Sequence, residues 1–278
     1  MADASAAGTF DIADLTVNRL GFGAMRVTGQ GVWGDPPDRE AALAVLRRAL
    51  SLGVNLIDTA DSYGPEVSEE LIRDALYPYP EGLVIATKGG LERSGPGQWH
   101  RNAHPDHLRE ACEGSLRRLR LERIDLYQLH APDPNVPIAE SLGELNALQN
   151  EGKIRHVGVS NFDTGQLAEA RELSTVVSVQ NRFNFDDRES EDVLEVCERE
   201  GLGFLPWFPL GAGSVEHDTL EDVGSRHDAS PMQIAIAWLL QKSPAMLPIP
   251  GTSSIEHLEE NVAAASIELS DEDIATLG

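Results

Sequence analysis

The stretch DREAALAVLRRALSLGVNLIDTA, residues 38–60, contains one complete unit of the fold that the sequence predicts. Its first part alternates apolar and charged residues near the helical period, with Asp38 placed to cap the amino terminus and Gly53 to end the helix. Its second part, NLIDTA at 55–60, is a short apolar run that closes on a polar side chain, Asp58. A helix followed by such a strand is typical of a parallel sheet covered by helices.

The same alternation of strand and helix recurs eight times along the chain. The predicted strands are 19–24, 55–60, 83–88, 124–130, 156–161, 176–181, 203–208 and 246–251. The predicted helices are 38–52, 105–119, 138–150, 164–171, 190–200, 231–241 and 254–265, with a helix or tail at 269–278 and a hairpin at 9–18. Eight units in about 250 residues match a (β/α)8 TIM barrel better than an open doubly wound sheet. No low-complexity linker divides the chain, so we expect one α/β barrel domain at 1–278 with the N-terminal β-hairpin closing its bottom.

The composition argues against several classes of partner. The 278 residues include 46 acidic and 22 basic side chains, which give a formal charge of −24, and no stretch supplies the basic cluster that nucleic acid or an anionic membrane needs. The amino terminus has no secretion signal, and no apolar run reaches the roughly 18 residues of a membrane span. Cys112 and Cys197 lack a spacing motif, which indicates reduced thiols. We expect a cytoplasmic protein, a monomer or small homo-oligomer, that binds a small molecule.

Polar residues lie at the carboxyl ends of five predicted strands, which is where such barrels hold their active sites. They are Asp58, Lys88, His130, the pair Ser160 and Asn161, and Gln180. Lys88 is one of only three lysines, so a compact ammonium at this position indicates a role that a guanidinium would not fill. Taken singly, Asp58 could cap a turn, His130 could be a hydrogen-bonded residue without a catalytic role, and Tyr63 could be a packing residue.

Taken together, four of these residues form a proton-donating device. A tyrosine with a pKa of about 10 is a poor acid at neutral pH, but a neighbouring ammonium lowers that pKa and a carboxylate fixes the ammonium. Tyr63, Lys88 and Asp58 have these roles. A neutral His130 could orient a carbonyl oxygen while Tyr63 delivers a proton as general acid. Because no side chain can donate hydride, a nicotinamide cofactor is implied.

The chain resembles the aldo-keto reductases over nearly its whole length. The motifs that carry this resemblance are LGFGAM at 20–25, DTADSYG at 58–64, ATKGG at 86–90, YQLHAP at 127–132, GKIRHVGVSNF at 152–162, VQNRFN at 179–184, FPLGAG at 208–213 and IPGTSSIEHLEEN at 249–261. The resemblance implies a catalytic tetrad of Asp58, Tyr63, Lys88 and His130 with Tyr63 as the acid. It also implies NADP(H) as the preferred cofactor, NAD(H) as the alternative, and an aldehyde or ketone as the substrate.

The same resemblance assigns the contacts to cofactor and substrate. Ser160, Asn161 and Gln180 would hold the nicotinamide carboxamide and Trp207 would stack on its ring, with Gly23, Met25 and Asp58 as further cofactor contacts. Leu210, Gly211 and Ser214 would lie along the pyrophosphate. The adenosine end would lie among Gly251, Thr252, Ser253, Ser254, His257, Glu260 and Asn261. The substrate would be surrounded by Met25, Trp33, Tyr63, Trp99 and His130.

Three further stretches are similar to the bacterial pyridoxal reductase-like branch of the family. They are GFGAMRVTGQGVWGDPPDRE at 21–40, ALYPYP at 75–80 and PIPGTSS at 248–254, and they make pyridoxal or another aromatic aldehyde the candidate substrate. Many family members place Lys or Arg where this chain has Ser253 or His257, and those cations pair with the 2′-phosphate of NADP. Trp207 and Phe208 replace the Tyr-Ser of many members, which makes the pocket more apolar.

Other interpretations remain open from the sequence. GFGAMR at 21–26 lacks the third glycine of a GxGxxG motif, so a Rossmann site is not supported. His100, His104 and His107 have spacings that a metal could use, but the segment carries no cysteine and we expect no metal. Lys88 could instead form a Schiff base, as in barrel aldolases, and borohydride would then trap the substrate on it, whereas a reductase oxidises NADPH as aldehyde is lost. A cofactor-binding regulatory subunit is the third hypothesis.

Overall fold

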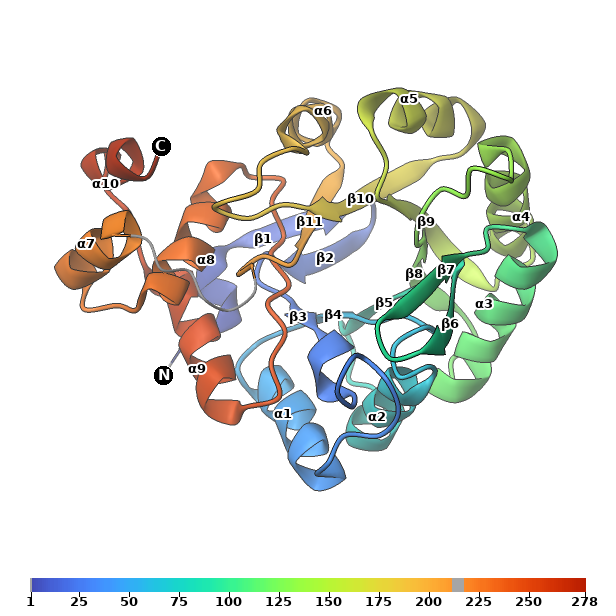
Figure 1. Ribbon diagram of the computed structural model, residues 1–278, viewed down its shortest axis with the longest axis horizontal. Coiled ribbons are helices and arrows are strands. Elements are labelled where there is room, and N and C mark those ends of the chain that lie inside the picture. The colour runs from blue at the N-terminus through green and yellow to red at the C-terminus, as the bar shows by residue number, and fades with distance from the viewer. Residues whose placement is uncertain (1, 212–217) are drawn as a thin grey trace.

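A parallel β-sheet curled into a barrel forms the centre of the computed structural model, which describes residues 2–211 and 218–278 (Figure 1). Seven strands pair in the order β11-β10-β9-β8-β5-β4-β3, and all neighbours are parallel. Each coincides with a predicted strand, so the predicted parallel α/β fold is confirmed. Their bounds are β3 (Phe22–Gly23), β4 (Leu56–Asp58), β5 (Val84–Gly89), β8 (Ile124–Leu129), β9 (Ile154–Ser160), β10 (Val176–Arg182) and β11 (Gly203–Trp207).

The eighth place in the barrel, between β11 and β3, is filled by the extended segment 246–250. On one side Leu247 donates its N–H to the carbonyl of Phe204 in β11 (2.8 Å), and on the other Gly21 donates its N–H to the carbonyl of Pro248 (2.9 Å). Pro248 itself has no N–H to donate, so the segment cannot continue a regular ladder. The predicted last strand therefore closes the (β/α)8 barrel through a few hydrogen bonds only.

Helices surround the barrel at the positions that the sequence predicts, to within about one turn. The predicted start of the first helix is confirmed, because the carboxylate of Asp38 accepts a hydrogen bond from the N–H of Ala41 (3.0 Å) and Gly53 follows the helix with a φ of +79°. The helices are α1 (Arg39–Ser51), α3 (Pro105–Leu119), α4 (Ile138–Asn150), α5 (Thr164–Leu173), α6 (Glu191–Glu200), α8 (Pro231–Lys242), α9 (Ile255–Ala263) and α10 (Asp271–Leu277), with the short 3-10 turns η1 (Ala4–Ala7), η2 (Ala24–Val27) and η3 (Ala264–Ser266).

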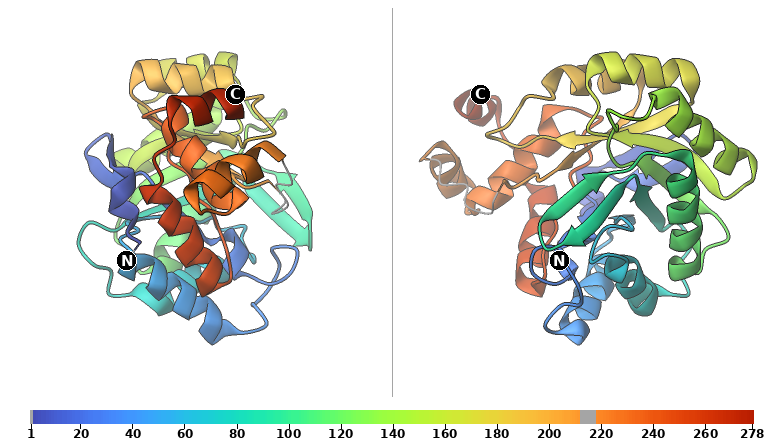
Figure 2. Two further views of the ribbon diagram at one scale, coloured as in Figure 1. Left: turned by 90° about the vertical axis from the view of Figure 1, so that its left-hand side faces the viewer. Right: turned by 45° about the vertical axis from the view of Figure 1, so that its right-hand side comes forward.

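The N-terminal hairpin, β1 (Thr9–Ile12) and β2 (Leu15–Asn18), fills one end of the barrel. Its side chains Ile12, Leu15 and Val17 belong to the same buried apolar cluster as residues from β4, β5, β8, β10 and β11. The side view in Figure 2 shows this hairpin and a second hairpin, formed by β6 (Leu91–Gly95) and β7 (Gln98–Arg101), at opposite ends of the barrel. The amino-terminal end of the barrel is thus closed, and the opposite end is left for a ligand.

The sequence did not predict β6, β7 or two helices, α2 (Val67–Leu76) and α7 (Asp218–His227). The apolar pattern of α2 is interrupted because Ser68 and Glu69 face the interior and are completely buried. Among the described residues no helix is both long and apolar enough to cross a membrane.

Glu69 links α2 to the barrel wall through two charge-assisted hydrogen bonds. Its carboxylate accepts from Thr87 Oγ1 in β5 (2.6 Å) and from Arg118 Nε in α3 (2.6 Å). Arg118 also donates to Glu66 (2.9 Å), whose side chain is 61% exposed. A buried ion pair is costly to break because the remaining charge loses its partner without regaining water.

We predict that Glu69→Gln lowers the free energy of unfolding by about 3 kcal/mol, because Arg118 is then left half-buried with a neutral partner. The matched variant Glu66→Gln removes an exposed partner of the same arginine and should cost less than about 1 kcal/mol. Urea unfolding of the two variants measures both values. Equal decreases in the free energy of unfolding for the two variants would contradict the claim that the buried ion pair matters more than the exposed one.

Candidate active site

Five strands bring the predicted polar residues together at their carboxyl ends. Asp58 ends β4, Lys88 is the penultimate residue of β5, and His130 directly follows β8. Ser160 ends β9, and Gln180 lies towards the end of β10. All of these except Lys88 line one cavity of about 790 Å³, and Lys88 is completely buried beside Asp58.

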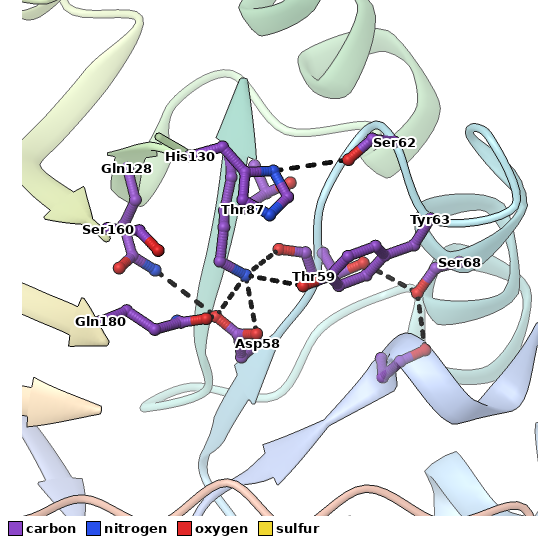
Figure 3. Close-up of polar contacts among 12 residues, drawn as sticks. Asp58, Thr59, Ser62, Tyr63, Ser68, Thr87, Gln128, His130, Ser160 and Gln180 are labelled. Atoms are coloured by element: carbon purple, nitrogen blue, oxygen red, sulfur yellow. Dashed lines mark hydrogen bonds and ion pairs between the residues drawn. The ribbon is translucent and has the colours of Figure 1, made fainter. Parts of the chain in front are cut away.

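The centre of the site is a buried ion pair between Lys88 and Asp58. The ammonium donates to both carboxylate oxygens (2.8 and 2.7 Å) and to the backbone carbonyl of Thr59 (2.9 Å). The carboxylate also accepts from the amides of Gln180 (2.7 Å) and Gln128 (3.4 Å), which Figure 3 shows converging on Asp58. Burial disfavours the charged ammonium most strongly, but the attraction and hydrogen bonds to Asp58 and Tyr63 together outweigh it and raise the pKa of Lys88.

Tyr63 lies against this pair, in the loop that follows β4. Its hydroxyl oxygen accepts a hydrogen bond from the Lys88 ammonium at 3.4 Å, and the ammonium lies 5.1 Å from the centre of its ring. The side chain is only 6% exposed, yet it lines the cavity. The hydroxyl is therefore within reach of a molecule in the cavity and of the ammonium behind it.

The structure corrects the expectation that the pKa of Tyr63 is lowered overall. Burial raises that pKa most strongly, the ammonium lowers it, and the carboxylate of Asp58 raises it again, so that the net change is upward. Because Lys88 and Asp58 form a nearly neutral pair, they cannot offset the loss of water around the phenol. The Tyr63 phenol is thus neutral and protonated throughout the neutral pH range.

His130 is held in its neutral form beside Tyr63. Burial, with a smaller contribution from the Lys88 ammonium, holds the pKa of His130 well below its ordinary value. Its Nδ1 lies 3.4 Å from the hydroxyl of Ser62, and its ring meets the Tyr63 ring edge to face at 5.8 Å. A neutral imidazole can donate one hydrogen bond from its other nitrogen to an uncharged acceptor such as a carbonyl oxygen.

Asp61, in the same loop as Tyr63, is a further titratable group near the site. Its Oδ1 is buried without a hydrogen-bond partner among the described residues. Burial, followed by repulsion from Glu69, raises the pKa of Asp61 to about 8, and its ionised form raises the pKa of Tyr63 further. Ionisation of Asp61 therefore keeps the proton on Tyr63 instead of removing it.

A polar and aromatic group forms the wall of the cavity next to Asp58. Asn161 donates to the carbonyl of His130 (2.9 Å) and to the hydroxyl of Ser160 (3.1 Å), and its side-chain oxygen accepts from the indole N–H of Trp207 (3.0 Å). This last bond fixes the orientation of the Trp207 ring, which lines the cavity. The wall thus offers a flat ring beside amide and hydroxyl groups.

All other residues predicted to contact cofactor or substrate line the same cavity, with three exceptions. Ser214 lies outside the described residues. Ser254 instead caps α9, its hydroxyl accepting from the N–H of His257 (3.4 Å). Trp33 forms a backbone bridge to Gly64, and its ring lies 5.8 Å from the Arg93 guanidinium. The roles of all these residues stay predictions.

The sequence interpretation missed several lining residues, of which Arg26 is the most informative. Arg26 follows the LGFGAM motif, and its side chain approaches Gly251 at the far end of the cavity. It is exposed and forms no ion pair or hydrogen bond with the part of the chain that the structure describes. The signal that the sequence offered was a basic residue directly after the LGFGAM motif in a chain with only 22 basic side chains. The other missed residues are the apolar Val32, Leu91, Phe208, Pro209, Met232, Ile249 and Pro250.

The three histidines with metal-like spacing take separate partners. His100 contacts the hydroxyl of Ser94 (2.7 Å), and His104 caps α3. His107 lies 3.5 Å from Glu92. Within residues 2–211 and 218–278, no group of three or more His, Cys, Asp or Glu side chains is placed to hold a metal.

Known proteins resemble the chain in sequence. The sequence profile of the aldo/keto reductase family matches residues 19–278. An uncharacterised oxidoreductase of Schizosaccharomyces pombe is 54% identical, and the alignment covers 99% of this chain and 90% of that protein. Pyridoxine 4-dehydrogenase of Escherichia coli is 44% identical, and the alignment covers 97% of this chain and 96% of that protein. This similarity confirms the resemblance to the pyridoxal reductase-like branch.

Solved structures of the same fold complete the comparison. A glycerol dehydrogenase from Gluconobacter oxydans superposes with a TM-score of 0.89 at 29% identity, over 98% of this chain and 94% of its own. An aldo/keto reductase from Klebsiella pneumoniae, solved with NADP and acetate, superposes with a TM-score of 0.80 at 29% identity, over 94% of this chain and 90% of its own. With a family match over residues 19–278 and relatives of this identity, the chain belongs to the aldo/keto reductase family of oxidoreductases.

Proposed function

We propose that this protein reduces an aldehyde to an alcohol with NADPH, and that Tyr63 supplies the proton. The observation that carries the proposal is the contact between the Tyr63 hydroxyl and the buried Lys88 ammonium at the edge of the cavity. We further propose that residues 1–278 act as one barrel domain. Its two free, buried cysteines suit the reducing environment of the cytoplasm.

The residues of the cavity fit a nicotinamide dinucleotide. Trp207 offers a fixed ring for stacking, and Ser160, Asn161 and Gln180 offer amide and hydroxyl groups for a carboxamide. At the far end Gly251 and Gly23 both line the cavity, and a Cβ on Gly251 would lie 2.4 Å from the Gly23 carbonyl oxygen, so this close backbone contact requires a glycine. When bound, the reduced nicotinamide supplies the hydride that no side chain can provide.

Arg26 supports NADP as the preferred cofactor. Ser253 and His257, which stand where many relatives have a cation, line the same end of the cavity as Arg26. A guanidinium there can pair with a phosphate oxygen through charge-assisted hydrogen bonds. The Klebsiella pneumoniae relative solved with NADP gives independent support.

The four residues at the centre divide the chemical work. Lys88 stabilises negative charge that develops on the Tyr63 oxygen as its proton leaves, and Asp58 holds Lys88 in place. The neutral His130 donates a hydrogen bond to the carbonyl oxygen of the substrate and orients it towards Tyr63. The burial of all four groups strengthens these interactions because water does not screen them.

The geometry does not favour the Schiff-base alternative. A Schiff base requires a neutral amine with a free lone pair, but the pKa of Lys88 is raised. Its three ammonium hydrogens are engaged by Asp58, the Thr59 carbonyl and Tyr63. The side chain is also completely buried.

An aromatic aldehyde is the substrate class that the cavity supports best. Its wall on the Tyr63 side includes Trp99 and the apolar side chains of Val32 and Leu91, and the Escherichia coli relative is named a pyridoxine 4-dehydrogenase. We predict that pyridoxal is reduced with a higher kcat/KM than propanal, and that the KM for NADPH is lower than that for NADH. A panel of aldehydes assayed with both cofactors tests this. The proposal fails if no aldehyde is turned over with either cofactor.

We predict that Tyr63→Phe lowers kcat for aldehyde reduction by about 100-fold or more, because the ring is kept and the proton donor is lost. The dissociation constant for NADPH, followed through tryptophan fluorescence, should change by less than about two-fold, since Trp207 and its partners are untouched. Wild-type turnover by this variant would show that another group is the acid.

The pKa directions predict a flat pH profile for reduction. Tyr63, with its raised pKa, stays protonated, and His130, with its lowered pKa, stays neutral. We therefore expect kcat/KM to vary by less than about three-fold between about pH 6 and pH 9, since neither group changes its protonation state in that range.

Asp61 is the control for this experiment because its raised pKa of about 8 falls inside the range. Its ionisation favours the protonated Tyr63, so Asp61→Asn should show the same flat profile. A loss of activity with an inflection near about pH 7 in the wild type would contradict the assignment of a protonated Tyr63 and a neutral His130.

A further inference from the structure

We propose that Arg93 is a positioning residue that fixes the substrate side of the cavity and so selects flat aromatic aldehydes over small aliphatic ones. The inference rests on the proposed function, because it names how that same cavity recognises its substrate. Arg93 lies in β6, directly opposite Trp99 of β7. This β6–β7 hairpin stands at the open end of the barrel, and the right-hand view of Figure 2 turns it towards the reader.

Every N–H of the Arg93 guanidinium has a carbonyl acceptor. Nη1 donates to Val32 (2.7 Å) and Ser62 (3.1 Å), and Nη2 donates to Gly31 (2.9 Å) and Gly95 (3.3 Å). Nε donates to Gln98 (3.1 Å). A guanidinium has five N–H donors in a rigid plane, and a lysine could not make five such bonds in these directions.

These acceptors belong to three separate parts of the chain. Gly31 and Val32 lie in the loop after β3, Ser62 precedes Tyr63 in the loop after β4, and the remaining two lie in the β6–β7 hairpin. Each of these segments also supplies a residue to the cavity wall, namely Val32, Tyr63 and Trp99. Arg93 therefore joins the three segments that carry the wall next to Tyr63.

Arg93 also covers one face of the Trp99 ring. The guanidinium carbon lies 3.6 Å from the ring centre, which is close contact for a cation over an indole. The same ring meets Tyr63 and His130 edge to face, at 6.3 and 6.4 Å between ring centres. Trp99 is thereby held next to both groups that are proposed to act on the carbonyl.

No carboxylate among the described residues pairs with Arg93 within salt-bridge distance. Its bonds go to neutral carbonyls, and burial lowers its pKa. Arg93 is only partly buried, so the guanidinium loses part of its water without gaining an ion pair. The five hydrogen bonds and the contact with the Trp99 ring offset that loss, and they hold the loops and Trp99 in place. A wall fixed in one position suits a rigid planar substrate more than a small flexible one.

The test compares pyridoxal and propanal in variants of Arg93 and Trp99. Arg93→Met should raise the KM for pyridoxal about ten-fold and change kcat/KM for propanal by less than about three-fold, while the dissociation constant for NADPH stays unchanged. Arg93→Lys should raise the KM for pyridoxal nearly as much as Arg93→Met, since a lysine cannot bridge the three segments. Arg101→Met is the matched control, because Arg101 is an exposed arginine of the same hairpin that makes no side-chain hydrogen bond or ion pair with the described residues.

A double variant distinguishes positioning from an independent effect on the fold. If Arg93 acts through Trp99, the KM of Arg93→Met/Trp99→Ala for pyridoxal should equal that of Trp99→Ala alone. The proposal would be overturned if the increases in KM for pyridoxal caused by the two single changes multiplied in the double variant. It would also be overturned if Arg93→Met lowered kcat/KM equally for pyridoxal and propanal.

Hydrogen exchange provides a readout that does not need turnover. The amides of Trp33 and Gly34, which bond to Gly29 and Gly64, should exchange at least about ten-fold faster in Arg93→Met and at the wild-type rate in Arg101→Met. Unchanged exchange would overturn the role of Arg93 as a link. Faster exchange in a protein that reduces no aldehyde would instead overturn the proposed function alone.

Discussion

A lysine ammonium and an aspartate carboxylate buried together at the ends of β5 and β4 impose the main constraint on this structure. Neither charge could be buried alone, so each needs the other and several further polar partners. Gln128 and Gln180 from β8 and β10 and the Thr59 carbonyl supply those partners. Strands that are distant in the sequence are thereby tied to one point in the barrel, and Tyr63 is placed against that point.

Two kinds of interaction around this ion pair determine the state of the site. The first kind is electrostatic. Because Lys88 and Asp58 nearly neutralise each other, burial is the main cause of the pKa shifts of Tyr63 and His130. The second kind is hydrogen bonding, through which Arg93 links the loops after β3 and β4 to the β6–β7 hairpin. A protonated phenol and an aromatic wall that are in place before a substrate binds would reduce the reorganisation that the proposed reaction requires.

The sequence predicted the parts that depend on local pattern. The strands could be recognised as short apolar runs, five of which carry a polar residue at their carboxyl end, and Pro105 marks the start of α3 where the structure has it. Helix α2 could not be recognised, because its buried Glu69 makes sense only with Arg118 and Thr87 beside it. The role of Arg93 was also hidden, since its acceptors are backbone carbonyls that leave no trace in residue identity. The raised pKa of Tyr63 depends on burial, which the motif does not show.

The proposed function requires that the site around Lys88 and Asp58 uses the Tyr63 proton in an NADPH-dependent reduction of an aldehyde. The most direct measurement follows NADPH oxidation and pyridoxal loss in the same reaction. We predict that NADPH and pyridoxal are consumed in equal amounts and at equal rates. Loss of pyridoxal without oxidation of NADPH, or binding of NADPH without any turnover of a carbonyl, would contradict it.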